Sequence, residues 1–325
     1  MPLPPLPARR AWRRLLACAA GAALALPSAA DAAPFSSTSV WNAPLPATAP
    51  PDPDSTALAA DLQRQVATYG PWINTTQYSV PIYKVPSTQP RVRVTLDKYN
   101  PDLQLAFDSV PLPDDAKPAA GWDKHLVVWQ VGTDTMWEFW ALARKTDGWH
   151  AGWGAKIVKV SQSIGVLPSP LGATATGLPL AGGLIRPFEL SDRWIPHALA
   201  LGLPNVRSTV FTWPATRTDG TFAAPASIPA GTRFRLPASL DVSALGLKPA
   251  VKAMAVAAQR YGIVVRDTSS AVTFYAEDPT PTGTNPYPAL FGTGWMDQAL
   301  AGFPWGRLQV VAPPSVTPVA PNPLR

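Results

Sequence analysis

The chain has 325 residues, of which only 15% are charged, with 40 prolines and 13 tryptophans. Soluble domains usually carry about 25% charged residues, so this composition suits a rigid domain with long ordered loops. The formal net charge is +6, but Lys and Arg are scattered among nearly as many acids, which argues against the dense basic face of a nucleic-acid-binding protein.

The first 33 residues have the order of a secretory signal peptide. Four arginines precede an apolar run from Leu15 to Leu26, and small residues follow Pro27 up to Ala33. The apolar run is shorter than the roughly 20 residues that a membrane-spanning helix needs, and no later stretch reaches that length. We therefore expect residues 1–33 to be cleaved and the rest of the chain to be secreted or periplasmic, without membrane insertion.

Cys18 is the only cysteine, and it lies within the predicted signal peptide. The remaining sequence then has no disulfide, no cysteine nucleophile and no thiolate metal site, so its stability has to come from the core. Residues 172–183 form a loop rich in Gly and Thr, but they lack the Lys of a phosphate-binding loop, and no GxSxG motif occurs in the chain. We expect no cofactor.

Two helices are predicted after a stretch rich in Pro, Ala and Ser, residues 35–53, that is expected to wrap the domain in extended form. The first helix covers residues 54–69, because apolar residues recur there at helical spacing. The second covers residues 249–261, with Pro249 at the first helical position, an apolar stripe on one face and Gly262 as the stop. This stripe is expected to pack on a sheet.

Most of the remaining pattern has period two or consists of short apolar runs separated by Gly, Pro, Asp and Ser, which is typical of β-strands. We predict a mainly β fold, an antiparallel sandwich or barrel-like sheet with about two packed helices. Residues 34–311 are expected to form a single domain, followed by a Pro-rich disordered tail at 312–325. The predicted strands are 78–85, 92–96, 126–131, 136–143, 157–160, 197–203, 209–213, 233–236, 263–266 and 272–276.

Six of the 13 tryptophans and two of the three histidines fall between residues 122 and 153. Within this window, residues 126–131 and 136–143 form a predicted hairpin with a four-residue loop. The register that follows from this loop sets Trp129 opposite Glu138. The window is therefore the strongest candidate for a functional site.

Alternation along the hairpin puts four side chains on one face: His125, Trp129, Glu138 and Trp140. Indoles stack on the apolar faces of sugars, while His and Glu exchange protons with a glycosidic oxygen or ring carbon. Asp123 faces the same way if the strand starts early, and it would orient His125 or serve as the second carboxylate of a glycoside hydrolase. We therefore predict catalytic roles for His125, Glu138 and Asp123, and substrate binding by Trp129 and Trp140.

Each of these residues also has a structural interpretation. Tryptophans in a hairpin often belong to the core, and Glu138 can simply accept a hydrogen bond from an indole N–H. His150 lies close to two glycines and is expected in a loop. Asp219 precedes a glycine and is first a turn signal, although its carboxylate could join the cleft.

His197 and Arg186 complete the predicted substrate-binding set. His197 follows Pro196 and is expected at a strand start, near a sheet edge or cleft. If the protein were a lyase with His125 as the base, Arg186 or Lys124 would neutralise the carboxylate of a uronate. A metal held by His125, His197 and a carboxylate has no clustered histidine motif in its favour, so no metal is expected.

Segments spread along the chain carry a recognisable pattern: residues 39–45, 72–83, Asp123-Lys-His125 with Trp137-Glu-Phe-Trp140, 177–186, 197–199, 213–215 and 260–267. In these segments the chain resembles a group of secreted proteins of high-GC bacteria to which no activity is assigned. The resemblance implies an exported single-domain protein, and it supplies no catalytic residues.

Three functions are open from the sequence. The first is a secreted carbohydrate-active enzyme, a hydrolase or lyase that acts as a monomer on an extracellular polysaccharide. The second is a non-catalytic carbohydrate-binding or cell-wall-associated module, and the third is a structural exported protein whose tryptophans all lie in the core. Sites rather than folds decide function, so the discriminating observation is whether His125, Glu138 and His197 line one open pocket.

Overall fold

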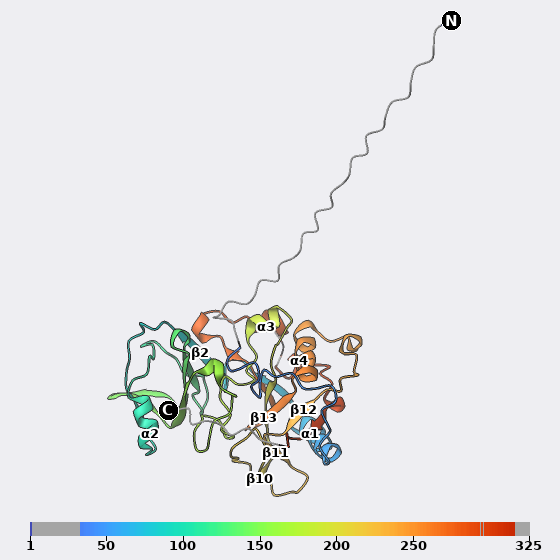
Figure 1. Cartoon of the computed structure of the whole chain (residues 1–325), viewed down its shortest axis with the longest axis horizontal. Helices are drawn as coiled ribbons and strands as arrows, with labels where there is room; N and C mark the ends of the chain where they lie inside the picture. The colour runs from blue at the N-terminus through green and yellow to red at the C-terminus, as the bar shows by residue number, and fades with distance from the viewer. Residues whose placement is uncertain (2–32, 293, 295, 316–325) are drawn as a thin grey trace. The chain divides into compact units, whose positions relative to one another are not determined.

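Within the residues that the computed structural model describes, 16 strands form four sheets, with helices packed against them (Figure 1). The described residues are Met1, 33–292, Gly294 and 296–315. Most of the predicted signal peptide, and residues 316–325 of the predicted tail, therefore lie outside the described residues. From Ala33 onwards the described residues belong to one compact unit.

The largest sheet has six strands drawn from distant parts of the chain. The β1–β14 and β9–β13 pairs are parallel, and the other neighbours are antiparallel. All residues of β9 are buried, which is why this strand reads as a continuous apolar run. The strand order is β1 (Pro71–Asn74), β14 (Val272–Tyr275), β9 (Leu199–Leu203), β13 (Ile263–Thr268), β12 (Arg233–Arg235) and β16 (Gln309–Val311).

The second large sheet has five strands, and two small sheets complete the strand set. In the five-stranded sheet β15, β2 and β4 run parallel, whereas β4, β5 and β8 are antiparallel neighbours. Its order is β15 (Glu277–Asp278), β2 (Val80–Val85), β4 (Leu126–Gln130), β5 (Thr135–Trp140) and β8 (Trp153–Val158). The small sheets are β3 (Val94–Leu96), β7 (Gly148–Ala151) and β6 (Ala143–Lys145), and β10 (Val206–Phe211) with β11 (Ile228–Ala230).

The prediction of a mainly β fold is confirmed at this level. The expected antiparallel arrangement holds for only some of the strand pairs, because both large sheets contain parallel ones. Parallel pairs require long crossover connections, and the irregular loops of this chain provide them. Neither large sheet closes into a barrel within the described residues.

Both predicted helices are present. Helix α1 covers Ser55–Tyr69 and α4 covers Pro249–Arg260, and Met254 in the apolar stripe of α4 is fully buried. Helix α4 packs against β9 and β12, as the stripe predicted (Figure 1). The described residues also contain short helices that the periodicity did not predict: α2 (Pro101–Phe107), α3 (Pro187–Ser191), α5 (Tyr287–Phe291), α6 (Met296–Ala299) and five 3₁₀ turns, at Val131–Thr133, Val160–Gln162, Val242–Leu245, Thr280–Thr282 and Trp305–Arg307.

The predicted hairpin forms, but its register was wrong. The loop between β4 and β5 comprises residues 131–134, so it begins one residue earlier than expected. Glu138 therefore pairs with Val127 rather than with Trp129. Because the register moved by two residues, the alternation is preserved, and Trp129, Glu138 and Trp140 still belong to the same face of the sheet. Its opposite face packs on α2, where the rings of Phe107 and Phe139 are 4.8 Å apart.

Residues 172–183, the predicted Gly/Thr loop, are hydrogen-bonded to both large sheets, and we call them the inter-sheet segment. The backbone N–H groups of Ala173 and Leu180 donate to Glu138 on β5, each at 2.8 Å. Arg266 on β13 donates to the carbonyl of Leu180 at 2.7 Å. The segment thus links a strand of the five-stranded sheet to a strand of the six-stranded sheet.

The N-terminal stretch 35–53 supplies part of the core. Trp41 is 1% exposed and donates its indole N–H to the carbonyl of Gly165 at 2.8 Å. A Cβ atom at Gly182 would lie 2.4 Å from the indole of Trp41, and one at Gly183 would lie 2.6 Å from it. Only glycine lets the backbone approach the ring this closely, which explains the Gly-Gly pair that the sequence placed in a loop.

Candidate functional site

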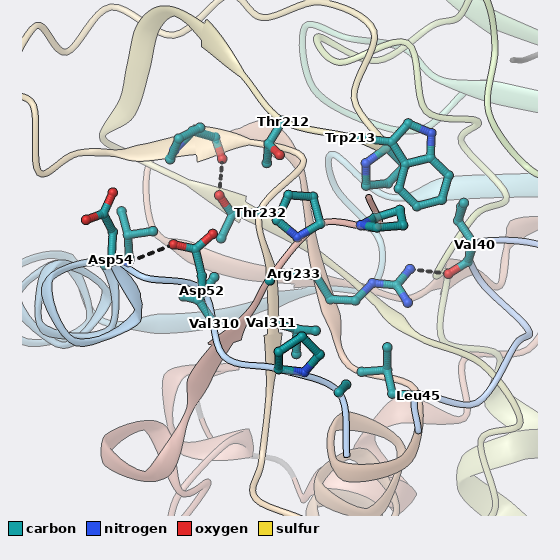
Figure 2. Close-up of a pocket in the computed structure, with 18 of the residues that line it drawn as sticks. Val40, Leu45, Asp52, Asp54, Thr212, Trp213, Thr232, Arg233, Val310 and Val311 are labelled. Atoms are coloured by element: carbon teal, nitrogen blue, oxygen red, sulfur yellow. Dashed lines mark hydrogen bonds between the residues drawn. The ribbon is translucent and has the colours of Figure 1, made fainter. Parts of the chain in front are cut away.

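A cavity of about 1070 Å³ lies between the N-terminal stretch, α1 and β16, and we call it the apolar groove (Figure 2). Its walls are mostly proline and aliphatic side chains. The side chain of Arg233 points toward the carbonyl of Val40, to which it donates, and away from Asp52 and Asp54 (Figure 2). No histidine occurs among the described residues of its lining, so the groove offers little to proton-transfer chemistry.

A second cavity, about 690 Å³, is lined largely by polar side chains, and we call it the polar pocket. Two residues singled out in the sequence, Asp123 and His125, line it together with Asp267 and Tyr275. They come from both large sheets, because Asp123 and His125 precede β4 while Asp267 and Tyr275 lie on β13 and β14. Further lining is supplied by Trp72, Asn74, Thr75, Thr76, Gln77, Tyr78, Thr268, Ser269, Ser270 and Thr273.

His125 is 4% exposed, and its Nδ1 has no hydrogen-bond partner among the described residues. Burial, helped by the charge of Arg266, lowers the pKa of this imidazole to about 4, although Asp123 and a hydrogen bond with the backbone of Ala173 act in the opposite direction. The ring is therefore neutral at pH 7, and a neutral imidazole has one nitrogen that can accept a proton. With a pKa of about 4, His125 can accept a hydrogen bond at pH 7 but is a weak general base.

Asp123 is held in place by an indole. Trp140 donates its Nε1–H to the Oδ1 of Asp123 at 3.1 Å. The backbone carbonyl of Asp123 also accepts from Ala141 at 2.7 Å, which extends the hairpin beyond β4 and β5. The sequence predicted that Asp123 would share a face with His125, and both line the polar pocket. Trp140 orients this carboxylate and does not line the pocket itself.

Asp267 is the carboxylate that the sequence interpretation missed. It lies on β13 after Arg266, and burial raises its pKa to about 7, with the charge of Arg266 opposing and those of Asp219 and Asp123 adding to the shift. Asp219 is next to it, since Thr268 donates to Oδ2 of Asp219 at 3.3 Å, and burial raises the pKa of Asp219 as well. Near pH 7 a substantial fraction of Asp267 carries a proton, as a general acid must.

Tyr275 lines the polar pocket, and Arg266 packs against the ring of Tyr275. The guanidinium of Arg266 lies 4.2 Å from the centroid of the Tyr275 ring and is fully buried. Its Nε and Nη2 have no hydrogen-bond partner within the part of the chain that the structure describes. Burial and nearby carboxylates raise the pKa of Tyr275, so its hydroxyl stays protonated and can donate a hydrogen bond into the pocket.

Glu138 lies behind the pocket and does not line it. Its side chain is fully buried, and both carboxylate oxygens accept backbone N–H groups of the inter-sheet segment. Burial raises the pKa of Glu138 to about 7, against the effect of these two hydrogen bonds and of the charges of Arg266 and Arg217. The predicted contact with an indole N–H is not what holds it. The geometry therefore favours a structural role for Glu138 over the predicted role as catalytic acid.

Trp129 is also separate from the pocket. Its side chain is 6% exposed, and the ammonium of Lys84 lies 5.8 Å from the ring centroid. Trp129 packs in the core of the five-stranded sheet, where a sugar could not reach its face. The aromatic side chains that do line the polar pocket are Trp72, Tyr78 and Tyr275.

His197 and Arg186 meet each other in a cluster of their own. Glu189 on α3 receives a hydrogen bond from His197 at 3.1 Å and one from Arg186 Nε at 3.0 Å. Burial would raise the pKa of Glu189, but the charges of His197 and Arg186 and their hydrogen bonds outweigh it and lower this pKa to about 2. His125, Glu138 and His197 therefore do not line one pocket, and the cluster closes the start of α3.

His150 is not in a loop, as its flanking glycines suggested, but on β7. Its ring nitrogens lie 2.9 Å from Asp97 and 3.0 Å from Asp147. The hydrogen bond from His150 lowers the pKa of Asp97. Both ring nitrogens of His150 are hydrogen-bonded, and His150 does not line the polar pocket. It is part of the small sheet of β3, β7 and β6.

No protein-family model matches the chain, and neither the curated proteins nor the solved structures contain a significant match. In the described part of the chain no group of three His, Cys, Asp or Glu side chains is arranged to hold a metal ion. Nor does any helix there have the length and apolar character needed to cross a membrane. The candidate site is therefore the polar pocket with its titratable side chains, Asp123, His125 and Asp267.

Proposed function

We propose that the protein is a secreted or periplasmic enzyme that acts on an extracellular polysaccharide, with the polar pocket as its active site. The observation that carries this proposal is the meeting of Asp123, His125 and Asp267 in one open pocket. Perturbed proton affinities at convergent groups in a cleft are typical of catalytic sites. In this role Asp267 is the proton donor, and Asp123 or His125 is the base or nucleophile.

The remaining lining suits a sugar. Hydroxyl and amide side chains are frequent in the lining of the polar pocket, among them Asn74, Gln77, Ser269 and Thr273. Such groups exchange hydrogen bonds with sugar hydroxyls, while Trp72 and Tyr78 offer aromatic faces for the apolar side of a pyranose ring. Neutral polar lining with aromatic walls therefore supports a glycan rather than a peptide or lipid.

Hydrolysis fits the pocket better than β-elimination. Glycoside hydrolysis uses two carboxyl groups, one as acid and one as base or nucleophile, and Asp267 and Asp123 supply such a pair. A lyase needs a cationic group to neutralise the uronate, and Arg186, the predicted candidate, lies in the Glu189 cluster. Lys124 is absent from the described lining of the pocket. We therefore propose a glycoside hydrolase and keep the lyase as an outcome of the test.

The test screens the purified protein against neutral and uronate-containing polysaccharides, with reducing ends and ultraviolet absorbance of unsaturated products measured together. Reducing ends alone indicate a hydrolase, and a rise in both indicates a lyase. Asp267→Asn and Asp123→Asn should each lower the rate by about 10² to 10⁴, the usual effect of removing a general acid or base. Asp114→Asn, which removes an exposed charge elsewhere, should leave the rate unchanged.

A non-catalytic carbohydrate-binding module is the second candidate, because Trp72 and Tyr78 would serve binding without turnover. In that case a glycan should bind, Trp72→Ala should weaken binding, and neither product signal should rise. Loss of stacking on one aromatic ring costs about 0.5 to 1.5 kcal/mol beyond its buried area. Absence of both binding and product with every glycan class would remove support from the site as a whole.

A further inference from the structure

The ionisable carboxyl groups that line the polar pocket are those of Asp123 and Asp267, and Lys and Arg are missing from the described lining residues. Because burial raises the pKa of Asp267 to about 7, this group is largely protonated and uncharged at mildly acidic pH. Asp219 stands next to them, bonded to Thr268 of the same lining. An anionic sugar would meet carboxylates of like charge here, whereas a cationic sugar would meet opposite charge.

Two cations act on the acidic groups of this region, Arg217 on Asp219 and Arg266 on Asp267, but neither lines the pocket. Arg217 directs its guanidinium to backbone carbonyls, at 2.7 Å to Pro170, 2.9 Å to Gly172 and 2.6 Å to Thr174. Arg266 is fully buried against the Tyr275 ring and donates its Nη1 to the inter-sheet segment, while its Nε and Nη2 have no partner among the described residues.

A second, independent feature points to a donor ligand. His125 lines the polar pocket at 4% exposure, and its Nδ1 has no partner among the described residues. A neutral imidazole and the carboxylate of Asp123 are acceptors, and an ammonium group has three N–H donors and no acceptor. Aromatic faces, here those of Trp72, Tyr78 and Tyr275, add attraction for a cation.

We propose that the polar pocket selects glycans whose sugars carry a free, protonated amine, such as deacetylated amino-sugar polymers. This inference rests on the proposed function for the identity of the site, but it concerns what the site binds. The ammonium pairs with the carboxylate of Asp123, with His125 as a further acceptor. N-Acetylation removes the charge and two of the three donors, so the acetylated polymer is the sharpest comparison.

The experiment compares chitosan oligosaccharides with fully N-acetylated chitin oligosaccharides of the same length, by calorimetry at mildly acidic pH. The free amine should bind at least tenfold more tightly, and this preference should shrink when salt is raised from 0.05 to 0.5 M. Asp123→Asn should abolish the preference, and Asp114→Asn, a charge-matched substitution at an exposed site, should keep it. The acetylation and salt comparisons use the unmodified chain, so they stand even if Asp123→Asn fails to fold.

Equal or tighter binding of the acetylated oligosaccharide, or of an oligouronate, would overturn the inference. Cleavage of neutral glycans without any preference for the amine would overturn it while leaving the proposed hydrolase intact. Tight, salt-sensitive binding of chitosan without release of reducing ends would support the inference and remove the proposed catalysis. Failure of the proposed hydrolase therefore shows in the release of reducing ends, whereas failure of the proposed amine preference shows in the comparison of binding.

Discussion

Replacing Glu138 by Gln changes one atom of a fully buried side chain and tests what that side chain does. Both of its oxygens accept backbone N–H groups of the inter-sheet segment, at 2.8 Å each. Gln has a single acceptor oxygen, so its NH₂ group would face one of these two donors and leave it unsatisfied. An unsatisfied buried donor costs about 1 to 3 kcal/mol. We expect Glu138→Gln to fold with that loss of unfolding free energy at pH 5.

The loss should depend on pH. Burial raises the pKa of Glu138 to about 7 in the folded protein, above its value of about 4.3 in an unfolded chain. The folded state thus holds this proton more tightly, and the resulting stabilisation is complete below the unfolded value and disappears as the pH rises through 7. At about 1.4 kcal/mol per pH unit over the roughly 2.7 units between the two pKa values, the contribution lost by pH 8.5 is about 4 kcal/mol, most of it above pH 5. The variant lacks it, so its deficit should shrink by about 2 to 3 kcal/mol between pH 5 and 8.5.

Urea unfolding of both proteins at pH 5, 7 and 8.5 measures this deficit directly. Asp114→Asn is the control, because its exposed carboxylate should change stability by less than about 0.5 kcal/mol at each pH. A deficit that is the same at pH 5 and 8.5 would mean that Glu138 does not hold its proton as inferred. A variant as stable as the parent at pH 5 would mean that the two amide hydrogen bonds do not hold the segment.

Three further outcomes follow from the fold. Met254→Asp in the buried stripe of α4 should cost at least about 3 kcal/mol, since it buries an unpaired carboxylate, and a melting temperature within a degree or two of the parent would contradict this. Glu189→Gln removes the buried carboxylate that accepts hydrogen bonds from Arg186 and His197 and should cost about 3 to 5 kcal/mol in urea unfolding. With Cys18 as the only cysteine, melting should not respond to a thiol reductant, and a shift would reveal a disulfide between chains.

The elements that the sequence predicted well are those whose pattern is local. Helix α4 combines a proline start, a single apolar stripe and a glycine stop, and it was placed within a residue. Helix α2 was missed because it is only two turns long, although Asn100 and Pro101 mark its start and the Asn100 side chain accepts the N–H of Leu103 at 2.9 Å. Strand direction was missed because period two is the same in parallel and antiparallel sheets.

The sequence predicted only part of the candidate site, because only part of it comes from residues that are close together in the chain. Asp123 and His125 are two residues apart, so they are close in any conformation, although the strand does not start early and Lys124 between them has φ 42°. Asp267 comes from a strand far along the chain, and only the contact between the two large sheets brings it to the pocket. The available signal was an Arg-Asp pair at the end of the apolar run of residues 263–265, because charged residues in buried strands usually have a specific role.

The pairing of β1 with β14 also governs when the protein can fold. Pro71 on β1 pairs with Val272 on β14, and β12 pairs with β16, which comprises residues 309–311. During synthesis, the six-stranded sheet therefore has no first edge until the chain has grown past Val272, and no second edge until Val311 has left the ribosome. Long-range pairing of this kind closes large loops before any contact compensates the lost chain entropy, so folding is slow. The six-stranded sheet is therefore completed late in synthesis, whereas β2, β4, β5 and β8 of the five-stranded sheet are all present once residue 158 has been made.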